Sequence, residues 1–349
     1  MRIGFDAKRI FHNWRGLGNY SRDLVTSYRD NFPQNDLFLY TPKYADQRAL
    51  EFENSFGGQY IITPESFLGK QIPSVWRRGI CNLLKAHQID LYHGLSHELP
   101  SGLRKSGIKS VVTIHDLIFL RYPEYFPLID RQIYLAKIKH AIKQSDCIIS
   151  ICEQTKNDLI EYLKVNPSKI EVCYQSCNEI YQKGKISHDK IIHVREKYNL
   201  PKKFFLFVGA LEERKNILNL IEGYSYFGVS YDLVIVGRDR EYKKEILRKI
   251  RSCDLDNNIH VLTNVEQKDL PALYAGAEIF CFPSFFEGFG IPIIEALFCN
   301  TPVITSRGSC FPEVAGGGAL YVDPNSAFQI GKAMYDIVNV DNLKQDLIL

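Results

Sequence analysis

The fold is decided by the stretch Ile279-Phe280-Cys281-Phe282-Pro283-Ser284-Phe285-Phe286-Glu287-Gly288-Phe289-Gly290-Ile291-Pro292-Ile293-Ile294-Glu295-Ala296-Leu297. Its four apolar residues before Pro283 predict a buried strand. Pro292 suits the first turn of a helix, because its φ is fixed near the helical value. A loop with two glycines joins the strand to the helix, and this order is typical of an α/β domain.

Short apolar strands alternate with helix-length segments along the whole chain. We expect strands at residues 2–5, 37–40, 60–63, 91–93, 110–115, 147–151 and 170–173, and again at 204–208, 233–236, 259–262, 279–282, 303–305 and 320–322. Apolar strands separated by helices predict parallel sheets that are covered on both faces, and right-handed crossovers make each array a doubly wound, Rossmann-like domain.

A polar stretch, residues 182–203, separates the two arrays. We therefore expect two domains, residues 1–185 and 186–349, with a hinge near residues 180–203. The length of 349 residues also fits two domains. Ligands of such sheets bind beyond the carboxyl ends of the strands, so we expect the principal site in a cleft between two facing domains.

The composition is that of an ordinary globular protein, with 45% hydrophobic and 24% charged residues. No segment approaches the run of about 20 apolar residues that crosses a bilayer, and the first residues lack the pattern of a signal peptide. We therefore expect a cytoplasmic protein. Its nine cysteines contain no C-x-x-C pair, which favours reduced thiols over disulfides or a zinc site.

Charge is distributed unevenly along the chain. Residues 1–150 contain 20 Lys and Arg against 14 Asp and Glu, a balance of +6, whereas residues 151–349 contain 23 against 26, a balance of −3. Because no dense basic run is interleaved with aromatics, we expect no nucleic-acid partner. A peripheral contact with the cytoplasmic face of an anionic membrane is the better hypothesis, carried by residues 74–85 and by Lys137, Lys139 and Lys143. The alternative for residues 74–85 is an amphipathic helix of the core.

The loop in the opening stretch predicts a ligand site. Gly288 and Gly290 let a ligand approach the backbone, and free amides at the start of the following helix favour a phosphate. Glu287 in the loop and Glu295 one turn into the helix are good acceptors for sugar hydroxyls. The pattern therefore suggests a nucleotide sugar, with the pyrophosphate on the amides and one glutamate on each sugar ring. The alternative is a glycine turn with two solvated glutamates.

A second motif, Gly209-Ala210-Leu211-Glu212-Glu213-Arg214-Lys215-Asn216, follows the strand at 204–208. Arg214 and Lys215 are suited to neutralising a diphosphate leaving group, one by a bidentate fork and the other as a point charge. The alternative is an ordinary basic helix start.

Near the N-terminus, Gly16-Leu17-Gly18 follows the first strand. We expect a loop that brings backbone amides near a phosphate or a sugar, with a plain strand-to-helix turn as the alternative. The motif lacks the full spacing and the acidic partner of a dinucleotide site, which argues against NAD.

Histidines end two strands of the first array. His115 and Asp116 are candidates for binding the transferred sugar or assisting at the reacting centre. His93 and His97 are weaker candidates, and metal binding by them is not expected, because no third ligand lies at suitable spacing. Asp254-Leu255-Asp256 matches a metal-binding D-x-D pattern, but a helix-to-strand turn is the favoured interpretation.

These residues resemble the retaining glycosyltransferases of family 4, which have the two-Rossmann GT-B fold. The resemblance covers nearly the whole chain, favours the mannosyl-like and polysaccharide-building branch, and is strongest in the E-x7-E motif from Glu287 to Glu295. Further matching segments are Asp269 to Ala277, Thr301 to Ser306, Pro312 to Val314, Gly209 to Asn216 and His115 to Glu124.

The resemblance implies roles for the candidate residues. Glu287 and the amides of Gly288, Phe289, Gly290 and Ile291 would hold the transferred sugar and the diphosphate. Glu295 would bind the ribose, Arg214 and Lys215 the diphosphate, and Val265 would lie near the base. Gly18 would lie on the phosphate or acceptor side, and His115 near the transferred sugar. Asn19 and Asp116 would lie on the acceptor or sugar side.

The resemblance also implies the reaction. A hexose would pass from a nucleoside diphosphate sugar to a saccharide or glycolipid with retention of configuration, after front-face attack assisted by a donor phosphate oxygen. No metal or other cofactor would be needed, since two cations and the helix amides stabilise the leaving diphosphate. The alternatives are a nucleotide-sugar 2-epimerase and a non-catalytic nucleotide-sugar sensor.

The sequence departs from the family pattern in two places. Ala210 stands where many members have an arginine, so diphosphate binding would depend more on Arg214 and Lys215. The sequence ends at Leu349, before the terminal helical segment of many relatives, so it is either a short member or a truncated chain.

Overall fold

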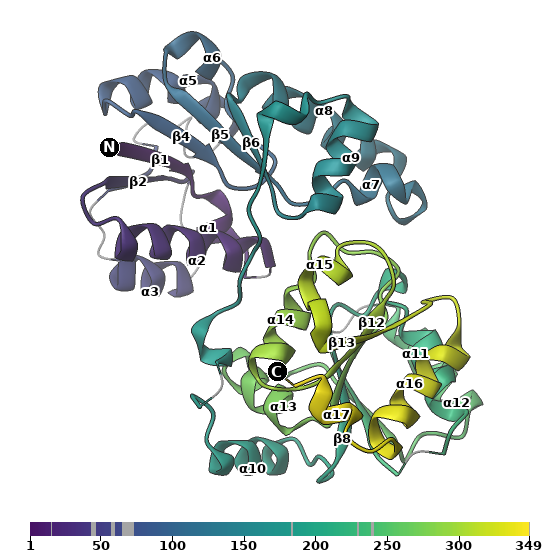
Figure 1. Ribbon diagram of the computed structural model, residues 1–349. Coiled ribbons are helices and arrows are strands. Elements are labelled where there is room, and N and C mark those ends of the chain that lie inside the picture. The colour runs from purple at the N-terminus through teal and green to yellow at the C-terminus, as the bar shows by residue number, and fades with distance from the viewer. Residues whose placement is uncertain are drawn as a thin grey trace. The chain divides into compact units, whose positions relative to one another are not determined.

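The computed structural model describes residues 1–14, 16–42, 47–56, 60–64, 73–182, 184–228, 230–238 and 241–348, and of residues 73–78 the backbone alone. The chain divides into two compact units, Met1–Gln175 (unit 1) and Ser176–Leu349 (unit 2) (Figure 1). The boundary expected from the sequence, after residue 185, lies later in the chain. The stretch 180–203, expected as a hinge, contains α10 (His188–Lys197), which packs on α13 (Leu270–Gly276) within unit 2.

Unit 1 is built on one parallel sheet of seven strands in the order β3-β2-β1-β4-β5-β6-β7. The strands are β1 (Arg2–Asp6), β2 (Asp36–Tyr40), β3 (Ile61–Ile62), β4 (Leu91–Gly94), β5 (Lys109–Ile114), β6 (Cys147–Ser150) and β7 (Ile170–Val172). Every neighbouring pair is parallel.

Helices cover both faces of this sheet (Figure 1). One face packs on α1 (Lys8–His12), α2 (Gly16–Asn31) and α3 (Gln47–Phe56), through a core that includes Ile10, Phe11, Val25 and Ala49. The other packs on α5 (Pro73–Ala86), α6 (Leu103–Ser106), α8 (Leu128–Gln144) and α9 (Glu153–Leu163), through a core that includes Ile80, Leu103, Ile138 and Leu159. A short helix, α7 (Ile118–Arg121), follows β5.

Unit 2 repeats the plan with six parallel strands in the order β10-β9-β8-β11-β12-β13. The strands are β8 (Phe204–Val208), β9 (Asp232–Val236), β10 (Ile259–Leu262), β11 (Ile279–Phe282), β12 (Val303–Ser306) and β13 (Ala319–Val322). The other helices of unit 2 are α11 (Ile217–Ser225), α12 (Lys243–Ser252), α14 (Ile291–Phe298), α15 (Phe311–Ala315), α16 (Ala327–Asn339) and α17 (Leu343–Asp346). In Figure 1, α11, α12 and α16 lie on one face of the sheet, and α13, α14 and α15 on the other.

The strand order reverses once in each sheet, between β1 and β4 in unit 1 and between β8 and β11 in unit 2. Loops that leave the carboxyl ends of such neighbouring strands diverge to opposite faces of the sheet, and ligands bind in the crevice they leave. The fold therefore directs attention to the segments after β1 and β4, and to those after β8 and β11.

The structure confirms all the strands expected from the sequence and the two doubly wound arrays. All nine cysteines lie within the described residues and are free thiols. The Asp254-Leu255-Asp256 motif lies between α12 and β10, where the Asp254 amide donates to the Arg251 carbonyl, which confirms the turn interpretation. Among the described helices, none combines the length and the apolar character that a membrane span requires.

Candidate active site

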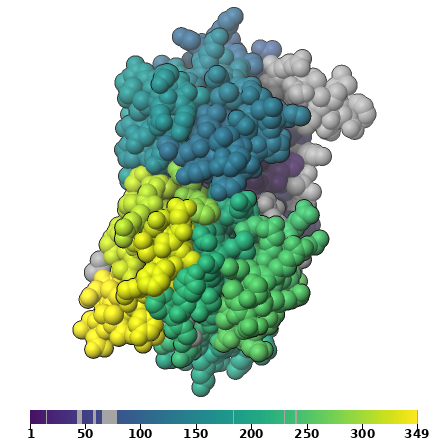
Figure 2. Space-filling view, turned by 90° about the vertical axis from the view of Figure 1, so that its right-hand side faces the viewer, coloured from purple at the N-terminus to yellow at the C-terminus, as the bar shows by residue number. Residues whose placement is uncertain are grey.

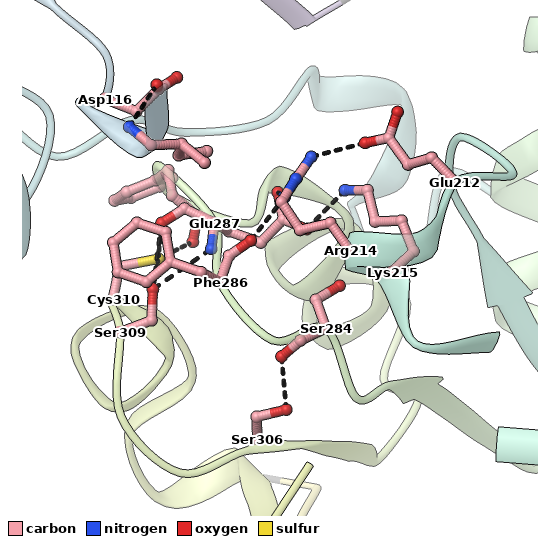
Figure 3. A network of polar contacts seen from close by, with 12 residues as sticks. Asp116, Glu212, Arg214, Lys215, Ser284, Phe286, Glu287, Ser306, Ser309 and Cys310 are labelled. Carbon is pink, nitrogen blue, oxygen red and sulfur yellow. Dashed lines mark hydrogen bonds and ion pairs between the residues drawn. The ribbon is translucent and has the colours of Figure 1, made fainter. Parts of the chain in front are cut away.

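Three of the predicted site residues meet in unit 2, beyond the carboxyl ends of β8 and β11 (Figure 3). Lys215 Nζ donates to Glu287 Oε1 at 2.5 Å, and Arg214 Nη1 lies 2.9 Å from Glu287 Oε2. Arg214 Nη2 also bonds Glu212 Oε1 at 2.7 Å. Lys215 and Glu287 are each 8% exposed, so this is a buried ion cluster.

The charges of this cluster determine its protonation. Burial alone would raise the pKa of Glu287, but the charges of Arg214 and Lys215 outweigh burial and lower that pKa to about 2. Burial lowers the pKa of the Lys215 ammonium, and the charge of Glu287 opposes this shift. At neutral pH the cluster therefore holds a carboxylate between two cations. The carboxylate can accept hydrogen bonds from sugar hydroxyls, and the cations can donate hydrogen bonds to an anion.

Backbone and side-chain hydrogen bonds fix the two loops that carry the cluster. The Phe285 amide donates to the Arg214 carbonyl at 3.0 Å. Asn216, in a left-handed conformation with φ 59°, donates its amide to the carbonyls of Pro283 and Pro324 at 2.9 and 2.7 Å. Because one buried amide joins three segments, the loop after β8 keeps its place against the loop after β11.

A third loop supports Glu287 from the other side (Figure 3). Ser309 Oγ donates to the Glu287 carbonyl at 3.1 Å, and Cys310 Sγ donates to the Phe289 carbonyl at 2.8 Å. The buried Ser284 hydroxyl, by contrast, has no hydrogen-bond partner among the described residues. The segment after β12 thus holds the backbone of the glutamate loop in place.

The glycine loop leads into α14 as expected. Gly288, Phe289 and Gly290 connect Glu287 to the first helical residue, Ile291. Gly290 has φ 97°, a conformation that favours glycine, and no side chain caps the helix start. Pro292 has no N–H, and the Ile293 amide already donates to the Gly290 carbonyl at 2.9 Å. The Ile291 amide and the positive end of the helix dipole are therefore what suit an anion at this end of α14.

Glu295 lies one turn into α14 and is held by a tyrosine. Tyr274, a buried residue of α13, donates its hydroxyl to Glu295 Oε2 at 2.8 Å. Burial raises the pKa of Tyr274 well above its ordinary value, and the nearby charge of Glu295 adds to this effect. The phenol therefore stays protonated and keeps donating. Val265 lies in the loop after β10, at the same carboxyl edge of the sheet.

In unit 1, His115 lies at the end of β5 with both ring nitrogens engaged. Nε2 is 2.8 Å from the Leu95 carbonyl, and Nδ1 is 3.1 Å from the Gln175 side-chain nitrogen. Since a carbonyl can only accept, Nε2 carries the proton and Nδ1 accepts from Gln175. Burial, followed by the effect of His97, lowers the pKa of His115 to about 3, so the ring is neutral.

His115 belongs to a larger buried network. The Tyr20 ring meets the His115 ring edge-on, with centroids 4.7 Å apart, and the Tyr20 hydroxyl is 3.1 Å from Thr113 Oγ1. Thr113 Oγ1 is in turn 2.9 Å from His93 Nε2. The start of α2 and the ends of β4 and β5 thus share one hydrogen-bonded cluster. The His97 ring lies beside the His115 ring, with centroids 5.3 Å apart and the planes tilted by 59°.

The other candidates of unit 1 have local partners. Gly18 was expected in a loop, but it lies in the first turn of α2. A Cβ at this position would lie 1.6 Å from the Asn13 carbonyl oxygen. The close approach of this carbonyl explains the glycine. Asn19 Oδ1 accepts from Arg22 Nη2 at 2.6 Å. Asp116 Oδ1 accepts from the Ile118 amide at 3.1 Å, at the start of α7.

Five residues that hold these groups have no role that the sequence predicts, namely Tyr20, Gln175, Glu212, Asn216 and Tyr274. Glu212, Asn216 and Tyr274 lie inside segments that match the family, and Tyr20 comes directly after Asn19. A left-handed asparagine between a strand and a helix is a recognisable signal, whereas nothing near Gln175 in the sequence indicates a contact with His115.

Comparisons with known proteins cover both units. The model of Glycosyltransferase Family 4 matches residues 14–178, and that of Glycosyl transferases group 1 matches residues 189–348. The O-antigen chain mannosyltransferase B of Escherichia coli is 30% identical over 360 residues, which cover 99% of this chain and 92% of that protein. The O-antigen chain mannosyltransferase RfbU of Salmonella typhimurium is 32% identical over 214 residues, which cover 61% of this chain and 56% of that protein.

Solved structures share the fold. A glycosyltransferase from Rickettsia africae ESF-5 superposes with a TM-score of 0.78 at 16% identity, over 99% of this chain and 90% of that one. Anabaena Alr3699/HepE, in complex with UDP and glucose, superposes with a TM-score of 0.77 at 19% identity, over 100% and 92% of the two chains. The sequence matches and the paired Rossmann-like units lead to one conclusion: the chain belongs to the family 4 glycosyltransferases and has the GT-B fold.

Proposed function

We propose that this glycosyltransferase transfers a hexose, specifically mannose, from a nucleoside diphosphate donor to a saccharide or lipid-linked saccharide during the assembly of an envelope polysaccharide. The observation that carries the proposal is the buried cluster of Glu287, Arg214 and Lys215. Support for mannose comes from the Escherichia coli O-antigen mannosyltransferase, a relative that this chain matches over 92% of its length.

In this proposal unit 2 binds the donor. Lys215 Nζ carries three N–H groups, and Glu287 is the one hydrogen-bond acceptor it has among the described residues. Its remaining N–H groups are therefore available to a diphosphate oxygen. Arg214, whose guanidinium bonds Glu212, Phe286 and Glu287, adds its positive charge, and the start of α14 adds the Ile291 amide. Glu287 accepts from hydroxyls of the transferred sugar, Glu295 accepts from the ribose, and Val265 lies near the base.

We further propose that the transfer retains the anomeric configuration and needs no metal ion. The acceptor hydroxyl attacks the anomeric carbon on the face from which the diphosphate departs, and a diphosphate oxygen receives the hydroxyl proton. Negative charge develops on the leaving diphosphate, which is where Arg214 and Lys215 supply positive charge. Buried cations act strongly there, because the surrounding dielectric constant is low.

Unit 1 serves the acceptor and the sugar in this account, through His115, Asp116, Asn19 and the α2 start at Gly18. His115 is neutral. Its Nε2 proton is donated to the Leu95 carbonyl, and its Nδ1 accepts from the Gln175 side-chain nitrogen. A neutral imidazole with a hydrogen bond at each ring nitrogen is suited to shaping the site, and not to acting as a free base. A lipid-linked acceptor would bring the protein to an anionic membrane, at its cytoplasmic face.

A donor panel tests the proposed function. The protein is incubated with UDP-, GDP-, ADP- and TDP-sugars, mannose donors included, in the presence of EDTA, and thermal stability and donor turnover are measured with and without a mannose-containing acceptor. We expect one mannose donor to stabilise the protein, to be slowly hydrolysed, and to give an α-linked product with the acceptor.

Other outcomes of the panel would replace the proposal. Stabilisation without turnover, even with acceptors, indicates a sensor of nucleotide sugars. A changed sugar configuration without transfer indicates a 2-epimerase. Turnover that depends on an added divalent cation contradicts metal independence.

A further inference from the structure

Unit 2 contains a cavity at the amino ends of its strands, away from the candidate active site. It lies between α10, α13 and Phe204, the first residue of β8, and has a volume of about 210 Å³. One water molecule needs about 10–15 Å³ of such space, so the cavity admits a small organic molecule. The residues of the candidate active site, by contrast, follow the carboxyl ends of β8 and β11. The cavity is therefore a separate feature of unit 2.

The inner walls of this cavity are apolar. Phe204 and Leu273 are buried, and Ile191 and Ala275 are half-buried at its sides. Apolar walls around an open space favour a ligand whose own apolar surface leaves water on binding. The cavity therefore suits a small apolar body.

Cations border the cavity, and none of its lining residues is acidic. His188, Ile191 and Arg195 lie three and four positions apart on α10, so they share one side of the helix. Lys202 contributes a further positive charge from the segment before β8. The two acidic residues of α10 do not line the cavity. An anionic ligand would therefore meet positive charge in this lining, without a competing carboxylate.

The lysines of α10 already have partners, whereas the cations at the cavity do not. Lys190 Nζ lies 3.0 Å from Asp269 Oδ1, and Lys197 Nζ lies 2.7 Å from Asp269 Oδ2. Arg195 is half-buried and Lys202 is exposed. Neither of these side chains has a hydrogen bond or an ion pair within the part of the chain that the structure describes. The guanidinium of Arg195 is therefore available to a ligand of the cavity.

We propose that the cavity between α10 and α13 binds a small organic carboxylate. The planar fork of Arg195 donates two parallel hydrogen bonds to the two carboxylate oxygens, a geometry that guanidinium groups favour. Lys202 adds a second charge, and the apolar body of the ligand lies against Phe204 and Leu273. The inference goes beyond the proposed function, since neither the donor nor the acceptor of the transfer enters this cavity.

Fluorine NMR of the full chain tests the site. The probe is 4-fluorobenzoate, which places a carboxylate on one ring. We expect it to bind with a dissociation constant on the order of 1 mM, a modest affinity for a molecule of this size. The uncharged 4-fluorobenzamide should bind at least about tenfold more weakly, because it cannot form the charged pair with Arg195. Inorganic phosphate, which has charge but no apolar body, should not displace the probe at equal concentration.

Two substitutions remove different parts of the site. Arg195→Met deletes the fork and should weaken binding of 4-fluorobenzoate on the order of tenfold. Ala275→Leu fills the cavity and should abolish binding. The matched controls are Arg248→Met on α12 and Ala136→Leu on α8, which make the same exchanges at exposed positions and should bind as the wild type does. The control helix α12 lies on the side of unit 2 that Figure 2 turns toward the viewer, whereas α13 lies on the other face of the sheet.

The candidate active site also contains cations, so two further measurements distinguish the sites. Arg214→Met should bind 4-fluorobenzoate as the wild type does, and neither UDP nor GDP should displace the probe. Displacement by a nucleotide, or loss of binding in Arg214→Met, would place the anion in the candidate active site and overturn the proposal.

Three other results would overturn the proposal as well. They are equal binding by Arg195→Met and the wild type, unchanged binding by a folded Ala275→Leu protein, and displacement of the probe by inorganic phosphate. Circular dichroism shows whether each variant is folded. Arg195→Met changes a half-buried side chain outside the core, so it decides the question even if Ala275→Leu does not fold.

Discussion

Lys215 Nζ lies 2.5 Å from Glu287 Oε1, and both side chains are buried. The two residues come from different connections, one after β8 and the other after β11, on either side of the point where the strand order reverses. Taking two charges out of water is costly, and their mutual attraction compensates only when the geometry is good. The protein maintains this buried ion pair at the carboxyl ends of β8 and β11, where the fold favours ligand binding.

Lys215→Met should destabilise unit 2, because it leaves Glu287 buried with Arg214 as its remaining cation. Removal of one partner of a buried ion pair costs about 3–5 kcal/mol, and we expect the lower end of this range since Arg214 stays. Urea denaturation measures the change in the free energy of unfolding. Lys332→Met is the control, because its partner Asp336 lies on the surface and such pairs contribute about 1 kcal/mol or less. Equal losses in the two variants would contradict the account.

Tyr274→Phe should weaken donor binding through Glu295. The substitution removes the hydroxyl that donates to Glu295 Oε2 and leaves the ring in the core. We expect the KM for the donor to rise several-fold, on the order of 1 kcal/mol for one lost hydrogen bond, with kcat changed less. Tyr224→Phe provides the comparison, since the Tyr224 hydroxyl donates to the Tyr231 carbonyl of the same unit. A matching rise in KM for both variants would indicate a general effect on unit 2.

Gly18→Ala should destabilise unit 1, whereas Gly16→Ala should not. A Cβ at Gly18 would lie 1.6 Å from the Asn13 carbonyl oxygen, so the chain before α2 would have to move. A Cβ at Gly16, in the same turn, meets nothing within 4 Å. Alanine there favours the helix by up to about 1 kcal/mol. Thermal unfolding of the two variants measures the difference, and a Gly18→Ala protein as stable as the wild type would disprove the packing argument.

Stability should fall as the pH drops below about 6.5, because His93 and His115 are buried as neutral rings. Burial, followed by the effect of His115, lowers the pKa of His93 to about 4, and burial, followed by the effect of His97, lowers the pKa of His115 to about 3. Between these values and the ordinary histidine pKa, the unfolded chain binds protons that the folded protein does not. Each ring then removes about 1.4 kcal/mol per pH unit from the free energy of unfolding.

Urea denaturation at pH 7.5 and at lower pH checks this dependence, and His93→Gln should reduce the slope by the contribution of one ring, about 1.4 kcal/mol per pH unit. An unchanged slope in this variant would show that His93 does not bind the proton that the argument assigns to it.

The sequence was sufficient for the strands because every one is a short apolar run, and burial on both faces of a parallel sheet requires such runs. Glu287, Arg214 and Lys215 could be found as well, since each lies in the connection that follows a predicted strand. The prediction of a linker at residues 182–203 was wrong, because it was based on the polarity of this stretch alone. In the structure Lys190 and Lys197 of α10 pair with the buried Asp269, a long-range contact that no local pattern reveals.

Contacts between distant segments also explain what the sequence could not show. Gly18 was assigned to a loop because a glycine pair usually marks one, yet the approach of the Asn13 carbonyl selects glycine within a helix. Gln175 reaches His115 across 60 positions of sequence, and Asn216 reaches Pro324 across 108. The chemistry of these residues is visible in the sequence, but their partners depend on the tertiary fold.

Donor titration of matched variants shows whether the buried cluster binds the donor. The mannose donor identified by the panel is titrated calorimetrically, in EDTA, into the wild type, Glu287→Gln, Arg214→Met and the surface control Lys332→Met, after circular dichroism has shown that each is folded. The account predicts that the two cluster variants lose at least about tenfold in affinity, since each loses a charged hydrogen bond to the donor, while the control binds as the wild type does. Unchanged affinity in folded Glu287→Gln and Arg214→Met proteins would contradict it.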